Sequence, residues 1–474
     1  MVAFHLWITP SNPPGYHRDE AALSLNAYTL STGLRDEDGA RLPLFLRSFD
    51  DYKSPVYPYV LAGIFRITGP DQQVARGLSA VLVLAAVLLL GLLARRLTGS
   101  WMVTTVVVVL AGMTPWLFEL GRMAIEATTQ PLLLVVLLLW LERIDRLARF
   151  GVAQGAVAGI LVGLITYSYT GSRLLGPLLA AAFAVFGGRG RWRFVLAGWA
   201  SFVLALVPIG IYAIRHPGNL TARYEATTIA RDGLSAPRVV GQAIGNWFRD
   251  VNPWHWATGG DPAPYIHNGG YGALFGAVVL LALAGAALVL VRERQRLWWR
   301  FVLVATLLVP IPAALTVDRY NAIRLATLPV FALVLAVPAI AALTGAARTS
   351  WPARGVAVIL AVTVVAQFAQ FLDIYRSRGP ARLVLFEAGV KPLLEGPLTA
   401  GETIYVDFDD RGAQAQARWR VAAAGLPPSR VAILPDGGIP PSGSLVFLRF
   451  QDCDYACEQV ASWEDYRLVR AVGY

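Results

Sequence analysis

The side chains of this sequence that could do chemistry stand outside long apolar runs or near the ends of these runs. They are carboxylates, guanidinium groups, a lysine and a histidine, namely Asp19, Glu20, Lys53, Arg122, Glu126, Arg173, Asp261, His267, Asp318, Arg319 and Arg324. The interiors of the apolar runs hold almost no ionisable groups. Because a charge at mid-membrane is costly and usually marks an ion path, this pattern argues against a transporter coupled to protons or sodium ions. Chemistry at the outer boundary of a membrane fits better.

Ten apolar runs are expected to cross a membrane as helices. Most approach the roughly 20 residues that span about 30 Å of hydrocarbon, and backbone amides inside lipid must be paired within their own segment. The expected spans are 78–97, 101–118, 123–142, 152–170, 174–187, 194–214, 271–291, 298–317, 323–345 and 353–373. Hydrophobic residues make up 56% of the chain and charged residues 15%, which is typical of a multi-pass integral membrane protein rather than of a soluble domain.

Arginines fall in every second connection between these spans, and the positive-inside rule makes those connections cytoplasmic. They are Arg95, Arg96, Arg143, Arg146, Arg149, Arg189, Arg191, Arg193, Arg292, Arg294, Arg296, Arg300, Arg348 and Arg354. Residues 1–77, segment 215–270 and the tail from about 374 then lie outside, and this parity predicts a further helix upstream of Met1. The net charge of +10 is explained by these loops and by anionic lipid, so no nucleic-acid partner is expected.

The exterior segments predict an organisation into residues 1–77, a membrane domain over 78–373, and a small α/β domain over 374–474. In the first segment, helices are expected over 20–32 and near 55–68, the former lying on the bilayer surface through Ala21, Ala22, Leu25 and Tyr28. Asp19 precedes this helix, where its ordinary role would be an N-cap. In the tail, strands are expected at 404–408, 431–434 and 445–450, with a helix near 413–424.

Two further exterior features have alternative interpretations. Aromatic residues cluster around Gly259-Gly260-Asp261, namely Trp247, Trp254, His255, Trp256, Tyr265 and Tyr271. Such rings stack on sugars, but they also populate the membrane interface, and taken alone the second interpretation is favoured. The two cysteines of the chain, Cys453 and Cys457, lie in the exterior tail, where a disulfide across a turn is favoured over a metal site.

A series of short segments, taken in order, resembles a known family. His17-Arg18-Asp19-Glu20-Ala21 is followed by Gly33, Pro43 and the run Asp51-Tyr52-Lys53-Ser54-Pro55-Val56-Tyr57-Pro58-Tyr59. The order continues with Arg76, Gly121-Arg122 with Glu126, Tyr167 to Arg173, Gly260-Asp261 with Gly272, and Arg324 with Pro329. Over about residues 15–345 this set is similar to the GT-C membrane glycosyltransferases, in particular to protein O-mannosyltransferases and lipid A aminoarabinose transferases.

The resemblance implies an all-α polytopic GT-C fold and an enzyme that moves a sugar from a polyprenyl phosphate carrier to a lipid, glycan or protein acceptor. It implies that Asp19 is the general base, with Glu20 holding it in place, and that a single displacement inverts the anomeric carbon. Lys53 would contact the carrier phosphate, where a cation stabilises the charge that grows in the transition state. Two departures stand out, because Tyr52 replaces a frequent Glu and Ser54 separates the lysine from Pro55.

Other candidate residues have equally plain structural alternatives. Arg122, Arg173 and Arg324 are candidates for the donor phosphate, since guanidinium binds phosphate oxygens through two hydrogen bonds, but arginines at helix ends are more often interface anchors. Lys53 itself could simply snorkel to the interface. Asp261, His267, Tyr57 and Trp256 are candidates for sugar or acceptor binding, and Asp261-Pro262 is also a common turn.

No cofactor and no metal are expected beyond a lipid-linked sugar as substrate. Asp36-Glu37-Asp38 superficially resembles the acidic metal site of the oligosaccharyltransferase branch, but a solvated turn is favoured. Walker, dinucleotide and HExxH motifs are absent from the sequence. We expect a multi-pass protein of the inner (plasma) membrane with an extracytoplasmic site. The alternatives are a flippase or transporter of lipid-linked sugars and, less favoured, a scaffold of an envelope assembly.

Overall fold

The computed structural model of the chain describes residues 2–6, 11–49, 51–147, 150–188, 191–230, 234–435, 438–449, 453 and 455–472. Arg149 and Arg189 of the expected cytoplasmic loops, and Phe450 of an expected strand, lie outside the described residues. The chain forms two compact units. The first comprises Met1–Trp7, Ser54–Val56 and Ser79–Tyr375, and the second comprises Ile8–Lys53, Tyr57–Leu78 and Arg376–Tyr474.

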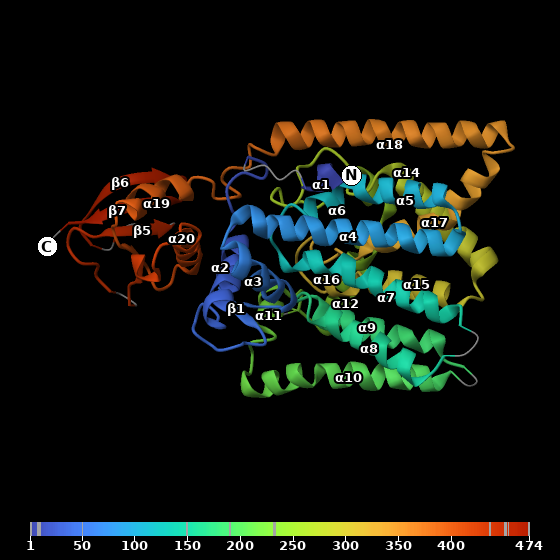
Figure 1. The fold of residues 1–474 in the computed structure, drawn as a ribbon, viewed down its shortest axis with the longest axis horizontal. Helices are drawn as coiled ribbons and strands as arrows, with labels where there is room; N and C mark the ends of the chain where they lie inside the picture. Colours follow the sequence, from blue (N-terminus) through green and yellow to red (C-terminus); the bar gives the residue numbers. More distant parts are fainter. Residues whose placement is uncertain are drawn as a thin grey trace. The chain divides into compact units, whose positions relative to one another are not determined.

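The first unit is a bundle of long apolar helices (Figure 1). Seven helices of the described chain are long and apolar enough to cross a membrane: Gln72–Thr98, Glu126–Asp145, Trp192–Arg215, Gly276–Glu293, Leu297–Ala314, Leu328–Ala346 and Trp351–Arg378. The three other expected spans coincide with the shorter apolar helices Trp101–Met113, Val152–Thr166 and Ser172–Phe186. The expected polytopic helical architecture is therefore confirmed, and the chain is a multi-pass membrane protein.

The described elements of this unit follow one another in a simple order. They are α1 (Val2–Leu6), α4 (Gln72–Thr98), α5 (Trp101–Met113), α6 (Pro115–Leu120), η1 (Glu126–Thr128), α7 (Thr129–Asp145), α8 (Val152–Thr166), α9 (Ser172–Ala182), η2 (Phe183–Phe186), α10 (Trp192–Arg215), α11 (Ala222–Thr227), α12 (Ala236–Asp250), α13 (Pro253–Thr258), α14 (Gly276–Leu288), η3 (Val289–Glu293), α15 (Leu297–Leu308), α16 (Ile311–Ala314), α17 (Leu328–Ala346) and α18 (Trp351–Arg378). The first residues of α4 belong to the second unit.

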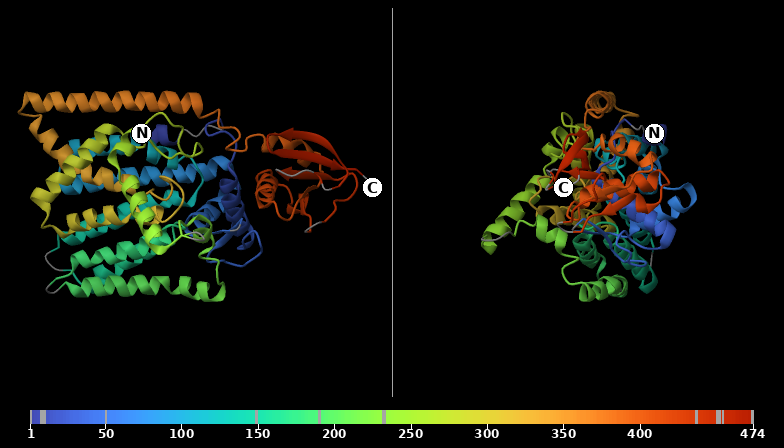
Figure 2. Two further views of the ribbon diagram at one scale, coloured as in Figure 1. Left: turned by 180° about the vertical axis from the view of Figure 1, so that it is seen from behind. Right: turned by 90° about the vertical axis from the view of Figure 1, so that its left-hand side faces the viewer.

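Small residues let the helices of the bundle approach closely. A Cβ added at Gly155 or Gly159 of α8 would lie 2.1 Å from a backbone oxygen of α10, and one at Gly285 of α14 would lie 1.8 Å from the Leu335 carbonyl of α17. Such spacing of small residues is the usual way for membrane helices to gain packing without a hydrophobic driving force. Along the opposite sides of the bundle, α10 and α18 leave most of their side chains exposed (Figure 2).

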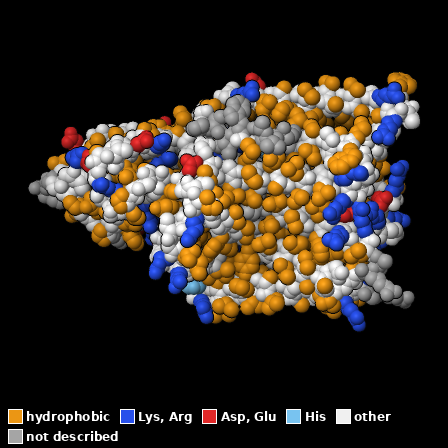
Figure 3. All heavy atoms as spheres, viewed as in Figure 1, with side chains coloured by type: hydrophobic (Ala, Val, Ile, Leu, Met, Phe, Trp, Pro, Cys, Tyr) orange, Lys and Arg blue, Asp and Glu red, His pale blue; other side chains and the backbone are white. Residues whose placement is uncertain are grey.

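Hydrophobic side chains cover the face of these helices, and basic side chains gather towards helix ends (Figure 3). The exposed apolar residues include Leu196, Val203 and Leu204 of α10 and Val358 and Ile359 of α18. Large exposed apolar surfaces are unfavourable in water. They are expected where a helix faces lipid.

The second unit combines the start of the chain with its end. It contains α2 (Arg18–Gly33), the antiparallel strands β1 (Leu46–Ser48) and β2 (Asp51–Lys53), most of α3 (Val56–Thr68), α19 (Val390–Thr399), α20 (Arg411–Ala423), η4 (Pro428–Arg430), and a five-stranded sheet. The sheet has the order β4-β3-β5-β7-β6 and consists of β3 (Ile404–Val406), β4 (Val431–Ile433), β5 (Leu445–Arg449), β6 (Cys457–Trp463) and β7 (Tyr466–Ala471). β3 is parallel to β4 and β5, while β7 is antiparallel to β5 and β6.

The small C-terminal α/β domain expected from the sequence is present, with β6 and β7 as additional strands. Its core packs α19 and α20 against the sheet through Leu394, Ile404, Val406, Ala417 and Phe447. Cys453 and Cys457 form a disulfide beside β6. Because the compact units combine parts of all three expected segments, the division into 1–77, 78–373 and 374–474 stays a proposal.

One expectation for the second unit is wrong. The helix predicted to lie on the bilayer surface, α2, packs against α20. Ala21, Ala22 and Leu25 are 0%, 1% and 3% exposed. The apolar spacing that suggested a lipid-facing surface therefore serves a protein core, and such spacing by itself does not distinguish the two.

Candidate active site

The first turn of α2 is organised by the two neighbours of Asp19. His17 is the N-cap residue, in extended conformation, and its Nδ1 accepts a hydrogen bond from the Asp19 backbone N at 3.2 Å. The Glu20 carboxylate accepts from the His17 backbone N at 3.0 Å, which completes a capping box. The N-cap role that could have explained Asp19 therefore belongs to His17 and Glu20, and the Asp19 carboxylate remains outside the cap.

Glu20 is fixed in a fully buried ion pair. The Arg76 Nε and Nη2 groups donate to the two carboxylate oxygens at 2.9 and 2.7 Å, and neither side chain is exposed. Arg76 also donates to the Pro13 carbonyl at 3.0 Å and lies over the Tyr16 ring at 5.3 Å. A carboxylate enclosed in this way offers no oxygen to a substrate, and the role expected for Glu20, holding Asp19 in place, stays a prediction.

Lys53 lies between two carboxylates of the same unit. Its Nζ donates to Asp51 Oδ2 at 3.1 Å and lies 3.9 Å from Asp19 Oδ1. Asp51 and Lys53 project from one face of β2, because side chains two apart in a strand share a face. β2 is paired to β1, and Asn26 of α2 donates to the Arg47 carbonyl of β1 at 3.0 Å. The hairpin thus carries the lysine to the first turn of α2.

The side chains of Asp19, Lys53 and Asp51 differ in their exposure to solvent. The Asp19 side chain is 41% exposed, the Lys53 side chain 14%, and the Asp51 side chain 9%. A half-exposed carboxylate beside a nearly buried ammonium can accept a proton from an approaching group while the ammonium attracts an anion. The two residues that the sequence singled out from distant segments are thus brought together.

The structure corrects two candidates for sugar or acceptor binding. The Tyr57 side chain is fully buried, and its hydroxyl donates to the Ala75 carbonyl at 2.8 Å, which ties α3 to α4. The Trp256 ring is 8% exposed, and its Nε1 donates to the Asp250 carbonyl at 2.8 Å. Both side chains hold the fold and present no surface to a ligand.

His267 belongs to a buried network of the first unit. Its Nδ1 lies 2.9 Å from Glu119 Oε2 and its Nε2 lies 3.0 Å from the Tyr271 carbonyl. The Tyr271 hydroxyl donates to Glu119 Oε1 at 2.5 Å. Burial by itself would lower the pKa of His267, but the Glu119 carboxylate and the Tyr271 carbonyl outweigh it, so the pKa is raised. With an acceptor at each ring nitrogen, the imidazolium is the favoured form, and His267 anchors its loop to α6.

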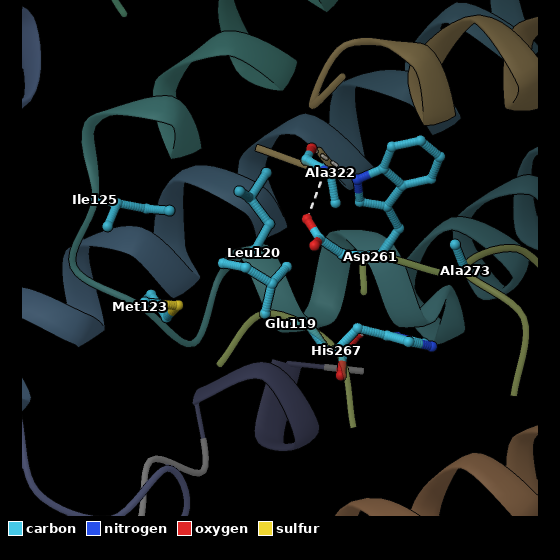
Figure 4. Close-up of a pocket in the computed structure, with 10 residues that line it drawn as sticks. Glu119, Leu120, Met123, Ile125, Asp261, His267, Ala273 and Ala322 are labelled. Atoms are coloured by element: carbon cyan, nitrogen blue, oxygen red, sulfur yellow. Dashed lines mark hydrogen bonds and ion pairs between the residues drawn. The ribbon is translucent and has the colours of Figure 1, made fainter. Parts of the chain in front are cut away.

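Asp261 anchors the same loop at a second point (Figure 4). Its Oδ1 accepts from the Ala263 backbone N at 2.8 Å and its Oδ2 from the Ala322 backbone N at 2.7 Å. Burial raises the pKa of Asp261 to about 6, although these two hydrogen bonds oppose the shift. Asp261, Glu119 and His267 border a cavity of ≈ 10 Å³, the space that one water molecule needs. The turn interpretation of Asp261 agrees with this geometry, and the cavity is too small for a sugar.

The three arginines considered for the donor phosphate each have an internal contact. Arg122 Nε donates to the Tyr375 hydroxyl at 3.3 Å, and Arg173 Nη1 donates to the Leu220 carbonyl at 2.9 Å. Arg324 Nη1 donates to Asp318 Oδ2 at 2.5 Å and to Thr316 Oγ1 at 2.7 Å. A phosphate would compete with the Asp318 carboxylate for Arg324. Their role in donor binding stays a prediction.

The acidic run Asp36-Glu37-Asp38 forms a turn. Asp36 Oδ1 accepts from the backbone N of Asp38 at 3.1 Å and of Ala40 at 2.8 Å, which is how an Asx side chain stabilises a turn. Burial raises the pKa of Glu37 to about 7. Within the described ranges, no group of three or more His, Cys, Asp or Glu side chains is arranged to hold a metal ion.

Sequence reasoning missed Asp51 and Glu119. Asp51 stands two residues before Lys53 in a short extended run, a spacing that places both side chains on one face of a strand. Glu119 is the single carboxylate of the apolar segment Pro115–Leu120, and ionisable residues in such segments are usually kept for a specific partner. The sequence shows both the spacing of Asp51 from Lys53 and the lone carboxylate at Glu119, but it does not show which residues these carboxylates contact.

Comparisons with known proteins agree with this fold. Residues 52–212 match the model of the family described as dolichyl-phosphate-mannose-protein mannosyltransferase. No curated protein matches the sequence significantly.

Among solved structures, the chain is similar to ArnT of Cupriavidus metallidurans bound to undecaprenyl phosphate, with 13% identity and a TM-score of 0.60 over 99% of this chain and 96% of that chain. The apo state of the same protein gives 14% identity and a TM-score of 0.58 over 99% and 96% of the two chains. The arabinofuranosyltransferase AftD from Mycobacteria shows 12% identity and a TM-score of 0.49 over 100% of this chain and 39% of that chain.

The protein is therefore a polytopic membrane protein with the GT-C fold of membrane glycosyltransferases. This confirms the fold that the resemblance of the ordered short segments implied. At such low identity the similarity to solved structures establishes the fold alone, so activity and substrates have to be argued from the residues themselves.

Proposed function

We propose that the protein is a glycosyltransferase that moves a sugar from a polyprenyl phosphate donor to an acceptor hydroxyl on the extracytoplasmic face of the plasma membrane. Three observations support this proposal. The fold is GT-C, residues 52–212 match a mannosyltransferase family, and Asp19 and Lys53 lie 3.9 Å apart. The similar ArnT structure contains undecaprenyl phosphate, a lipid of the class proposed as the carrier.

In the proposed reaction Asp19 is the general base. It takes the proton of the acceptor hydroxyl while that oxygen forms a bond to the anomeric carbon of the donor. The bond from this carbon to the phosphate oxygen breaks in the same displacement, so the configuration inverts and the carrier leaves as its phosphate. The Lys53 ammonium stabilises the negative charge that grows on this leaving group.

Asp51 and Glu20 act through these two residues. Asp51 orients the Lys53 ammonium through the hydrogen bond within β2, and Glu20 fixes the first turn of α2 from which Asp19 projects. The single observation that carries the assignment is the contrast within the acidic pair. Asp19 is 41% exposed beside an ammonium, while Glu20 is fully enclosed by its own partner.

The test uses purified protein in lipid nanodiscs with a panel of polyprenyl phosphate sugars. With an acceptor that carries a free hydroxyl in the mixture, the wild type should transfer the sugar to it and release the bare carrier from at least one donor, and Asp19→Asn should abolish both. Asp38→Asn is a matched control, because the Asp38 side chain is 35% exposed in the same unit and pairs with Arg47. It should react like the wild type.

The same panel separates the transferase from a flippase or transporter of lipid-linked sugars. A transporter would move a donor across the bilayer without releasing the carrier, and Asp19→Asn would leave that movement nearly unchanged. That outcome would overturn the proposed transfer reaction.

A further inference from the structure

The residues that lead into Asp19 are held by the C-terminal part of the second unit. The backbone N of Tyr16 donates to the Phe386 carbonyl at 2.7 Å, and Nε2 of Gln416 on α20 donates to the Tyr16 carbonyl at 2.7 Å. Tyr16, Phe386 and Gln416 are all fully buried. Because a buried backbone group needs a partner, these two hydrogen bonds fix the segment before α2 to residues from the other end of the chain.

Glu387 joins the same two segments through its side chain. Its carboxylate accepts from Gln416 Nε2 at 2.5 Å and lies 3.3 Å from Arg18 Nε. The Glu387 side chain is 5% exposed, whereas that of Arg18 is 38% exposed. One buried carboxylate thus holds the residue before Asp19, and the Gln416 amide connects that carboxylate to the Tyr16 carbonyl as well.

The backbone at Gly15 approaches residues 386–388 so closely that no side chain fits between them. Its φ of +62° is a conformation that favours glycine. A Cβ added there would lie 2.3 Å from the Phe386 carbonyl oxygen and 2.5 Å from the Ala388 Cα. Glu387 itself has a φ of +49°, which a residue with a side chain keeps only where its surroundings impose it. The two segments are therefore built to fit each other.

Aromatic rings cover this junction. The Tyr16 ring stacks on the Trp419 ring of α20 at 5.4 Å, and the edge of the Phe386 ring meets the His17 ring at 6.3 Å. The Arg76 guanidinium lies over the Phe386 ring at 5.7 Å. Apolar burial of this kind excludes water from the hydrogen bonds beneath it and strengthens them.

The junction reaches the Asp19 carboxylate through the start of α2. His17 is the N-cap residue and accepts from the Asp19 backbone N, so a shift of residues 15–17 moves the first turn of the helix. Lys53, 3.9 Å from Asp19 Oδ1, stands on the separate hairpin of β1 and β2. The distance between carboxylate and ammonium therefore depends on how the first turn is held, and a misplacement of about 1 Å can lower a rate about a hundredfold.

We infer that the C-terminal domain positions the first turn of α2 for transfer, with Glu387 as the positioning residue that acts on Asp19 through Arg18. The inference rests on the proposed transferase function and deepens it, because it gives residues Arg376–Tyr474 a part in the transfer step. In this role Glu387 touches no substrate.

The decisive variant is Gly15→Ala, with Gly425→Ala as its matched control. Gly425 belongs to the same unit and has a φ of +66°, but a Cβ added there would meet nothing within 4 Å. Both variants therefore incur a similar left-handed strain of about 1–2 kcal/mol. Only Gly15→Ala forces residues 15–18 away from residues 386–388.

Three properties of each protein are measured in nanodiscs: the melting temperature, equilibrium binding of bare polyprenyl phosphate, and single-turnover transfer from a donor lipid to a saturating acceptor. Gly15→Ala should transfer about tenfold to a hundredfold more slowly than the wild type while binding the carrier equally well, because Lys53 is not on the displaced segment. Gly425→Ala should keep the wild-type rate. A purely structural role would lower carrier binding and transfer in the same proportion, and that result would overturn the inference.

Glu387→Gln makes a smaller change at the same junction and removes only a charge. Its control is Glu402→Gln, because Glu402 lies 3.5 Å from Arg470 in an exposed ion pair of the same domain. Glu387→Gln should lower the transfer rate about tenfold with carrier binding unchanged, since a neutral amide keeps part of the contact. Glu402→Gln should transfer like the wild type. Wild-type rates for both Glu387→Gln and Gly15→Ala would overturn the inference.

Failure of the proposed function has a different signature. If the wild type shows no transfer, or transfer that Asp19→Asn leaves intact, the proposed function falls and the inference falls with it. If transfer depends on Asp19 but not on Gly15 or Glu387, the transferase stands and only the role of the C-terminal domain is wrong.

Discussion

The second unit and the first unit each contain a cluster of carboxylate and cationic side chains, but the two clusters are built differently. In the second unit, Lys53 Nζ lies 3.9 Å from Asp19, and the Asp19 side chain is 41% exposed. In the first unit, Glu119 and His267 are 2.9 Å apart and each side chain is 5% exposed. The first arrangement is loose and accessible, and the second is tight and closed.

This difference distinguishes a cluster that a substrate could reach, around Asp19, from a cluster that holds the fold, around Glu119. Glu119 accepts from His267 and Tyr271, and both ring nitrogens of His267 have acceptors, so a substrate would have to displace strong internal contacts. The Asp19 carboxylate lies 3.9 Å from Lys53 Nζ and 3.6 Å from His17 Nδ1, and its side chain is 41% exposed, so it can be approached from solvent. Residue type alone does not distinguish these groups, whereas exposure and saturation of hydrogen bonds do.

The largest effect on stability is expected from breaking the buried Glu20–Arg76 ion pair, which holds the first turn of α2. Glu20→Gln leaves the Arg76 guanidinium buried without a counter-charge, which should cost about 3–5 kcal/mol of stability by the usual penalty for half of a buried pair. Thermal unfolding in nanodiscs measures the loss. Arg76→Met added to Glu20→Gln should restore part of the stability, because the uncompensated charge is gone. Equal stability of Glu20→Gln and wild type would contradict the described pair.

Lys53→Met should weaken binding of bare polyprenyl phosphate by about tenfold to a hundredfold, since hydrogen bonds to charged groups contribute about 1.5–3 kcal/mol. The chain offers a sharp control, because Lys391 is its only other lysine and is exposed in the same unit. Lys391→Met should bind the lipid like the wild type. Equal binding by all three proteins would reduce Lys53 to an interface residue.

The stability that the buried Glu119–His267 pair contributes should depend on pH and not on the donor lipid. The pKa of His267 is raised in the folded protein, so its stabilising contribution is complete below the unfolded value near 6.5 and is lost as the pH rises through the folded value. His267→Gln should therefore lower the melting temperature more at pH 6 than at pH 9, by an amount corresponding to about 1–3 kcal/mol. His216→Gln, at an exposed position of the same unit, should show no such difference. A pH-independent loss would argue against an imidazolium at position 267.

Much of the fold could be predicted because it depends on local patterns. The ten apolar runs, α2, α3, α20 and the strands β3 to β5 follow from hydropathy and periodicity within single segments. The strands β6 and β7 were missed because Cys457–Trp463 is largely exposed and lacks a clear apolar alternation. The prediction that α2 lies on the bilayer surface was wrong, because the sequence of the helix does not show that its apolar face packs against α20.

The same holds for the candidate site: what depends on local motifs could be predicted, and what depends on distant partners could not. The ordered short motifs identified Asp19 and Lys53, and the structure brings them together. The partners of Glu20, Tyr57 and His267 could not be predicted, because Arg76, Ala75 and Glu119 stand in other segments of the sequence.

The central claim is that Asp19 serves the transfer step and not the binding of the carrier. The most direct test measures both properties on one preparation of Asp19→Asn, with bare polyprenyl phosphate for equilibrium binding and a donor sugar lipid for single-turnover transfer. We predict unchanged carrier binding and a transfer rate lowered by about 10² to 10⁴, the range for loss of a general base. Transfer at the wild-type rate, or loss of binding in step with transfer, would contradict the account.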